Sequence, residues 1–143
     1  MADRIEADAA GPSDPEVEET GKPCATFRDG ELPFGIDNLR YFAGAARSLE
    51  GTDEGVLSAG YTSMLLRRLV GVIGAITLWN FPFIVGVWKL APAIAAGNTV
   101  VLKPAPATSR TPLRTAEFAA KAGLPPGVLN VVTGVLRKPA PVR

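Results

Sequence analysis

The spacing of apolar residues changes repeatedly along the chain, and the changes predict helices alternating with strands. From 34 to 49 the apolar positions recur at roughly helical intervals, which predicts a helix with Gly51 as its stop. Residues 57–66 contain β-branched and aromatic residues without helical rhythm, which indicates a strand. A second extended run, 70–78, has to end before Pro82, because proline cannot sit inside a central strand.

The same alternation continues to the end of the apolar region. The pattern predicts a helix over 83–96 with Gly97 as its stop, and a short strand over 98–102. A helix from about 109 to 122 and a strand over 128–133 follow. Parallel strands need long crossovers, so strand–helix alternation predicts the α/β class, a parallel sheet with crossover helices.

Twenty consecutive residues, Leu69–Trp88, carry no charge, and this length also suits a membrane span. Asn80 and Pro82 lie near the middle, where a membrane helix would carry a polar amide and lose backbone hydrogen bonds. Three glycines weaken such a helix further. We therefore predict a buried strand that ends in a functional loop, and no membrane partner.

The charges divide the chain into two parts. Nine of the 14 acidic residues fall within 1–31, which we expect to be an acidic, mobile N-terminal segment. Residues 32–143 are apolar and mildly basic, and form the second predicted unit. The net charge of +1 gives no reason to propose a nucleic-acid partner. The N-terminus lacks the apolar core of a signal peptide, so we expect a cytoplasmic protein.

Two residue types limit the possible chemistry. The single cysteine, Cys24, excludes an internal disulfide, and the absence of histidine excludes the usual zinc clusters and Ser-His-Asp triads. No metal site is predicted. Without a histidine to activate it, Cys24 is expected to be a buried or incidental thiol.

Four segments at characteristic spacing resemble the coenzyme-binding region of the aldehyde dehydrogenase superfamily: GVIGAITLWNFPF, WKLAPAIAAGNTVVLKPAPATS, TAEFAAKAGLPPG and VLNVVTG. The stretches IDNLRYFAGAARSLEG and ETGKP resemble the family's N-terminal part, and the match is strongest to the aminoaldehyde and betaine-aldehyde type. The resemblance implies part of a Rossmann-like coenzyme domain, preceded by a helix and an extended strand segment used in subunit contacts. It also implies oxidation of an aldehyde to a carboxylic acid with NAD or NADP, and members that are homo-oligomers.

The resemblance assigns roles to particular residues. Asn80 matches the asparagine whose side-chain amide helps to hold the oxyanion formed from the aldehyde, although asparagine here could also merely close a turn. Lys103 matches the lysine that binds hydroxyls of the adenosine ribose, and an exposed lysine at a strand end is the alternative. The remaining coenzyme positions are Ile76, Thr77, Leu78, Trp79, Ala105, Pro106 and Gly134.

The sequence departs from the family pattern in ways that affect these expectations. Leu78 replaces a usual proline before the tryptophan, which loosens the loop that supports Asn80. Pro106 replaces a glutamate that accepts hydrogen bonds from ribose hydroxyls, so both NAD and NADP stay open, with NAD favoured. The family's nucleophilic cysteine and glutamate base have no counterpart here. The resemblance therefore predicts a truncated enzyme that does not turn over by itself, with an incomplete, aggregation-prone sheet. The alternative is a non-catalytic nucleotide-binding or subunit-interaction module that pairs with an intact homologue.

Overall fold

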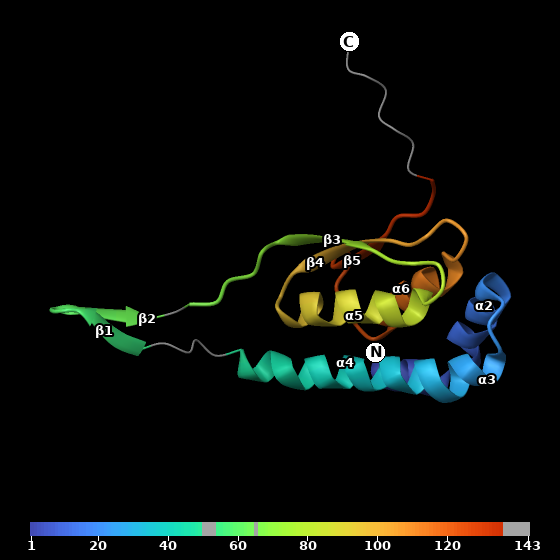
Figure 1. Cartoon of the computed structure of the whole chain (residues 1–143), viewed down its shortest axis with the longest axis horizontal. Coiled ribbons are helices and arrows are strands. Elements are labelled where there is room, and N and C mark those ends of the chain that lie inside the picture. Colours follow the sequence, from blue (N-terminus) through green and yellow to red (C-terminus); the bar gives the residue numbers. More distant parts are fainter. Residues whose placement is uncertain (50–53, 65, 136–143) are drawn as a thin grey trace, which may run out of the picture.

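The computed structural model describes residues 1–49, 54–64 and 66–135, which form helices packed on a small parallel sheet and a separate hairpin (Figure 1). The elements are, in chain order, α1 (Ala2–Ala7), α2 (Ala10–Thr20), α3 (Cys24–Thr26), the π-helix η1 (Phe27–Glu31), α4 (Leu32–Ala45), the 3-10 helix η2 (Ala46–Ser48), β1 (Glu54–Ser58), β2 (Tyr61–Met64), β3 (Val72–Ile76), α5 (Pro82–Ala95), β4 (Thr99–Lys103), α6 (Arg110–Lys121) and β5 (Leu129–Val131).

The main sheet has the order β3-β4-β5, and both strand pairs are parallel. Helix α5 connects β3 to β4 and helix α6 connects β4 to β5, as a parallel sheet requires. The register places Ile76 opposite Lys103 and Val100 opposite Leu129. This arrangement confirms the predicted α/β class, and its helices and strands lie within a few residues of the predicted ranges.

Side chains alternate between the two faces of this sheet, and the helices of residues 1–49 and 66–135 cover one of these faces. Ala75, Val100 and Leu102 are buried on the face that packs against α5. On the opposite face Val72 is 70% exposed and Ile76 is 66% exposed. Helix α4 packs on the far side of α5, so the layers run sheet, α5, α4 (Figure 1).

The uncharged run 69–88 forms strand β3, a loop and the first half of α5. The strand ends at Ile76, and Pro82 stands at the first position of α5, where its missing N–H removes no helical hydrogen bond. Within the ranges that the structure describes, no helix is long and apolar enough to cross a membrane.

The first 31 residues contain more regular structure than their composition predicted. Helices α1 and α2 occupy most of 1–20, and Ile5 and Phe27 are fully buried in the main apolar cluster with residues of α4, α5 and α6. The pattern concealed this packing because α2 buries Ser13 and Glu16 rather than bulky apolar side chains. In place of the expected mobile segment, the structure has helices packed against the body of the chain.

The region predicted as one strand over 57–66 is a hairpin. Strands β1 and β2 are antiparallel, and Gly60 lies between them with φ of 85°, a conformation that suits glycine in a tight turn. The hairpin lies well apart from the helices and the main sheet (Figure 1). The predicted helix stop, Gly51, lies outside the described residues.

A buried side-chain amide fixes the start of β3. Asn98 Oδ1 accepts hydrogen bonds from the backbone N–H groups of Val70 (2.7 Å) and Gly71 (2.8 Å). Its Nδ2 donates to the carbonyl of Ala93 at 3.1 Å. Asn98 therefore connects the end of α5 to the start of β3. This connection fixes the register of β3 against β4, which brings the carboxyl ends of the two strands together.

Candidate functional site

The carboxyl ends of β3 and β4 bring the two halves of the predicted site together. Ile76 and Lys103 are register partners at the last position of each strand, and the backbone N–H of Thr77 donates to the carbonyl of Lys103 at 3.1 Å. The loops that carry Asn80 and Pro106 both leave from this edge. Ligands of open parallel sheets bind at this edge, outside the carboxyl ends of the strands.

The amine of Lys103 lies close to its own backbone. Its Nζ donates to the carbonyl of Pro104 at 2.8 Å, and the side chain is half-buried. An ammonium group has three donors, so two N–H groups remain for hydroxyl oxygens of a ligand. The hydroxyl of the neighbouring Thr77 is buried and has no hydrogen-bond partner within the described part of the chain. The two remaining donors of Lys103 suit hydroxyl oxygens such as those of a ribose.

Asn80 occupies the loop between β3 and α5. It is half-buried, and Phe81 follows it as the N-cap of α5, with extended φ of −136°. Its amide is therefore close in sequence to the positive end of a 14-residue helix. The preceding Leu78 and Trp79 are 60% and 61% exposed, so this loop is open to solvent on that side.

The remaining predicted positions lie in the loops after β4 and β5. Ala105 is half-buried and Pro106 is exposed, in the connection from β4 to α6. Gly134 follows β5 with φ of 117°, where a side chain would be strained. Pairing between β4 and β5 places both loops at the same edge as Lys103.

A buried charged cluster stands beside the Asn80 loop, and sequence reasoning missed it. We call Lys22, Glu16 and Glu31 the Lys22 cluster. Lys22 Nζ lies 3.1 Å from Glu16 Oε1 and 2.6 Å from Glu31 Oε2, and its side chain is 11% exposed. The cluster joins α2 to the end of η1, and the only sequence signal was a lysine in an acidic segment.

Glu16 also reaches the start of α5. Its Oε1 accepts a hydrogen bond from the backbone N–H of Phe83 at 3.5 Å, which places a carboxylate at the positive end of that helix. Burial raises the pKa of Glu16, and the contacts with Lys22 oppose that rise. Its second oxygen, Oε2, is buried and has no hydrogen-bond partner among the described residues.

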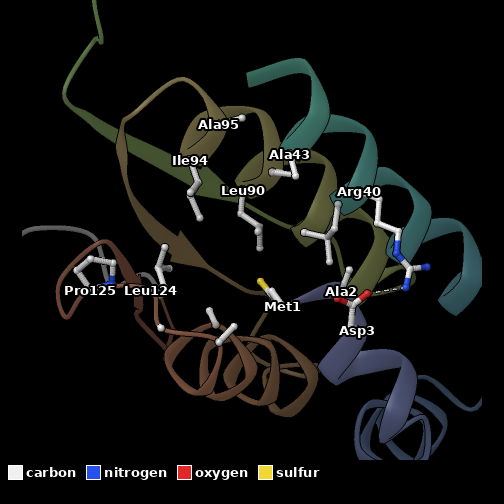
Figure 2. Close-up of a pocket in the computed structure, with 15 residues that line it drawn as sticks. Met1, Ala2, Asp3, Arg40, Ala43, Leu90, Ile94, Ala95, Leu124 and Pro125 are labelled. Carbon is white, nitrogen blue, oxygen red and sulfur yellow. Dashed lines mark hydrogen bonds and ion pairs between the residues drawn. The ribbon is translucent and has the colours of Figure 1, made fainter. Parts of the chain in front are cut away.

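A cavity of about 490 Å³ lies elsewhere, between α1, α4, α5 and α6 (Figure 2). Leu90, Ile94 and Leu124 line it with aliphatic surface, and Arg40 pairs with Asp3 at its rim at 2.7 Å. None of the predicted site residues lines this cavity. Its lining offers little polar chemistry, so the edge of the sheet is the better candidate site.

Cys24 is the first residue of the short helix α3, and its thiol is exposed. Of the two expectations, a buried or an incidental thiol, the exposed thiol excludes the first. Helix α3 has only three residues. The sequence contains no histidine that could deprotonate the thiol. We assign Cys24 no catalytic role.

The parallel sheet with its crossover helices places the chain among the α/β proteins, in which ligands bind at the carboxyl edge of the sheet. The chain belongs to the aldehyde dehydrogenase family, whose family model matches residues 1–139. The resemblance found in the four sequence segments is thereby confirmed at the level of the family.

Individual relatives agree with this assignment. The chain is 45% identical over 138 residues to fluoroacetaldehyde dehydrogenase of Streptantibioticus cattleyicolor, covering 94% of this chain and 26% of that protein. It is 44% identical over 116 residues to aminoacetaldehyde dehydrogenase of Pseudomonas aeruginosa, covering 81% of this chain and 23% of that protein.

The fold is also shared with solved structures. The crystal structure of PnpE in complex with nicotinamide adenine dinucleotide superposes with a TM-score of 0.89 at 39% identity, over 94% of this chain and 27% of that one. The chain thus spans about a quarter of the length of the proteins it matches.

Proposed function

We propose that this chain provides the oxyanion donor and part of the coenzyme site of an NAD(P)-dependent aldehyde dehydrogenase. The observation that carries the proposal is the meeting of Lys103 with the Asn80 loop at the carboxyl edge of the sheet, through the Ile76–Lys103 register. In this proposal residues 32–143 are part of the coenzyme-binding domain.

Asn80 supplies the donor that the reaction needs. When a nucleophile adds to an aldehyde, the carbonyl oxygen gains negative charge, and a fixed neutral amide stabilises that charge without losing a proton. The neighbouring N-terminus of α5 adds favourable electrostatic potential at the same place. Replacing Asn80 by alanine in the product of the natural gene is expected to lower kcat by on the order of 100-fold.

Lys103 and Thr77 bind and orient the coenzyme. The two free N–H groups of the Lys103 ammonium donate to ribose hydroxyls, and Thr77 lies on the nicotinamide side with Ile76, Leu78 and Trp79. Bound NAD supplies the acceptor for the hydride that leaves the aldehyde carbon. The adenosine end of the coenzyme is lined by Ala105, Pro106 and Gly134. NAD is favoured, although Pro106 carries no charge that would repel the 2′-phosphate of NADP.

Calorimetric titration of NAD into the 143-residue chain tests the coenzyme site. We expect measurable binding, and a Kd raised by on the order of tenfold in Lys103→Met, because a charge-assisted hydrogen bond to ribose is lost. Lys121→Met, at the exposed end of α6, is the matched control and leaves the Kd unchanged. Absence of NAD binding by the unmodified chain would refute the proposal.

We further propose an aminoaldehyde or betaine-aldehyde as the substrate class. The resemblance of the stretches IDNLRYFAGAARSLEG and ETGKP to that type supports it, and so does the similarity to an aminoacetaldehyde dehydrogenase. The test compares kcat/KM of the natural gene product for aminoaldehydes, betaine aldehyde and fluoroacetaldehyde. A higher value for fluoroacetaldehyde than for any aminoaldehyde contradicts this substrate class. The 143 residues by themselves are expected to oxidise no aldehyde, because Cys24 is their only thiol.

The projecting hairpin favours a second candidate, a non-catalytic subunit-interaction module. Strands β1 and β2 stand apart from the body, as a segment that pairs with another subunit would (Figure 1). In either case we propose a cytoplasmic homo-oligomer or a complex with an intact homologue, and a reducing compartment suits the free thiol. Co-purification with a full-length homologue, without NAD binding, would favour the module over the enzyme.

A further inference from the structure

Lys22 makes a contact that its ion pairs do not require. Besides Glu16 and Glu31, its Nζ lies 4.8 Å from the centre of the Phe81 ring and 5.8 Å from that of Phe27. An ammonium over the face of an aromatic ring is attracted by the negative potential of that face. The two carboxylates hold the ammonium at this place, because a buried cation needs such partners.

Phe81 is the residue through which this contact reaches the site. It follows Asn80 directly and is the N-cap of α5, so its backbone sets the direction in which the loop enters the helix. Its ring is 42% exposed, and it is not part of the main apolar cluster. Apolar packing by itself therefore leaves the ring only partly held.

The start of α5 also contacts the Lys22 cluster. Glu16 accepts a hydrogen bond from the N–H of Phe83, and the Phe83 ring packs edge-to-face on Phe27 at 5.7 Å. The backbone just after Phe81 is therefore held at the start of α5 by Glu16, and the Phe81 ring is held by the ammonium of Lys22. The preceding Leu78 and Trp79 are 60% and 61% exposed, so burial restrains this part of the loop little.

We infer that Lys22 is a positioning residue for Asn80: by holding the Phe81 ring, it fixes the backbone that presents the Asn80 amide to the aldehyde oxygen. This inference rests on the oxyanion role proposed above for Asn80.

Hydrogen–deuterium exchange of the 143-residue chain tests the contact directly. Lys22→Met keeps the apolar stem and removes the cation, and Phe81→Leu keeps an apolar side chain and removes the ring. Each is expected to speed exchange of the backbone amides of Asn80, Phe81 and Phe83 by on the order of tenfold. Exchange within 115–121 of α6 should stay unchanged, because a positioning contact acts locally.

Three comparisons separate positioning from general stabilisation. Lys22→Arg should restore slow exchange, because the cation is retained. The double variant Lys22→Met/Phe81→Leu should exchange no faster than either single variant, because both remove one shared contact. Lys89→Met, on the exposed side of α5, should have no effect.

The outcomes decide the inference in either direction. Unchanged exchange of the amides of 80, 81 and 83 in Phe81→Leu, or strictly additive effects in the double variant, would overturn it. If Lys22→Met speeds exchange throughout the chain, its effect reports general destabilisation. The result for Phe81→Leu then decides whether the contact positions the loop, because this variant leaves the ion pairs of Lys22 intact. In the natural gene product Phe81→Leu should lower kcat about tenfold with the Kd for NAD unchanged. Local loosening in a chain that binds no NAD would support the contact and refute only the proposed function.

Discussion

Replacing Glu16 by glutamine is expected to stabilise the fold at neutral and alkaline pH, although it removes an ion pair. Glu16 is fully buried, and it shares Lys22 with Glu31, so two carboxylates face one ammonium. Glutamine has the same shape, and its oxygen still accepts hydrogen bonds from Lys22 and from the N–H of Phe83. Its neutral amide replaces the buried carboxylate, and the amide N–H groups can donate to the hydroxyl of Thr111, which interacts with Glu16.

The sign of the pH dependence follows from the direction of the pKa shift. Burial raises the pKa of Glu16 above its ordinary value of 4.5, so between 4.5 and the folded pKa the native state binds a proton that the unfolded state releases. Stability of the unmodified chain therefore falls as pH rises through this window. The neutral amide in Glu16→Gln does not titrate, so the stability of this variant does not fall with pH for this reason. An unsatisfied buried oxygen costs about 1–3 kcal/mol, so we expect a gain of about 1–2 kcal/mol above the window and none below pH 4.5.

Urea unfolding followed by circular dichroism, from pH 4 to pH 9, measures this difference in the free energy of unfolding. Asp14→Asn, which removes an exposed carboxylate from the same helix, is the matched control and should show no comparable pH-dependent gain. A Glu16→Gln variant that is less stable than the unmodified chain at pH 8, or a difference that does not change with pH, would refute the reasoning.

Three further predictions concern the packing of a helix, the start of β3 and self-association. A Cβ at Gly35 would lie 2.4 Å from the Phe83 ring, so Gly35→Ala should lower the free energy of unfolding by about 1–3 kcal/mol in urea titrations. The control is Gly44→Ala, in open space on the same helix, which should raise the free energy of unfolding by up to about 1 kcal/mol. Asn98→Ala leaves two backbone N–H groups at the start of β3 without their acceptor, and thermal unfolding should report a loss of about 2–3 kcal/mol; an unchanged midpoint would contradict this role. Val72→Thr should reduce self-association in sedimentation experiments, because Val72 lies exposed on the uncovered face of the sheet, and undiminished association would contradict this.

Local patterns located most of the sheet and its crossovers. The helical spacing before Gly97 and the strand after it match α5 and β4, because a run of apolar residues closed by glycine or proline fixes both the type and the end of an element. Placement of Lys103 and the Asn80 loop at one edge also followed, since parallel strands carry all their carboxyl ends to the same side.

Other features were not visible in these patterns. The single predicted strand over 57–66 is a hairpin because Gly60 permits a turn at positive φ, which apolar spacing does not report. The helices of the first 20 residues were missed because α2 buries polar side chains, and hydrophobic periodicity cannot register a buried glutamate.

The sequence by itself therefore determined the α/β class, the family and the residues at the carboxyl edge of the sheet. These depend on short-range spacing and on motifs whose members lie close together in the chain. The tertiary structure alone decided that Lys22, Glu16 and Glu31 form a buried cluster beside Phe81. The physical reason is distance along the chain: Lys22 and Phe81 are joined only when α2, η1 and α5 pack together, and a charge is buried only where that packing supplies its partners.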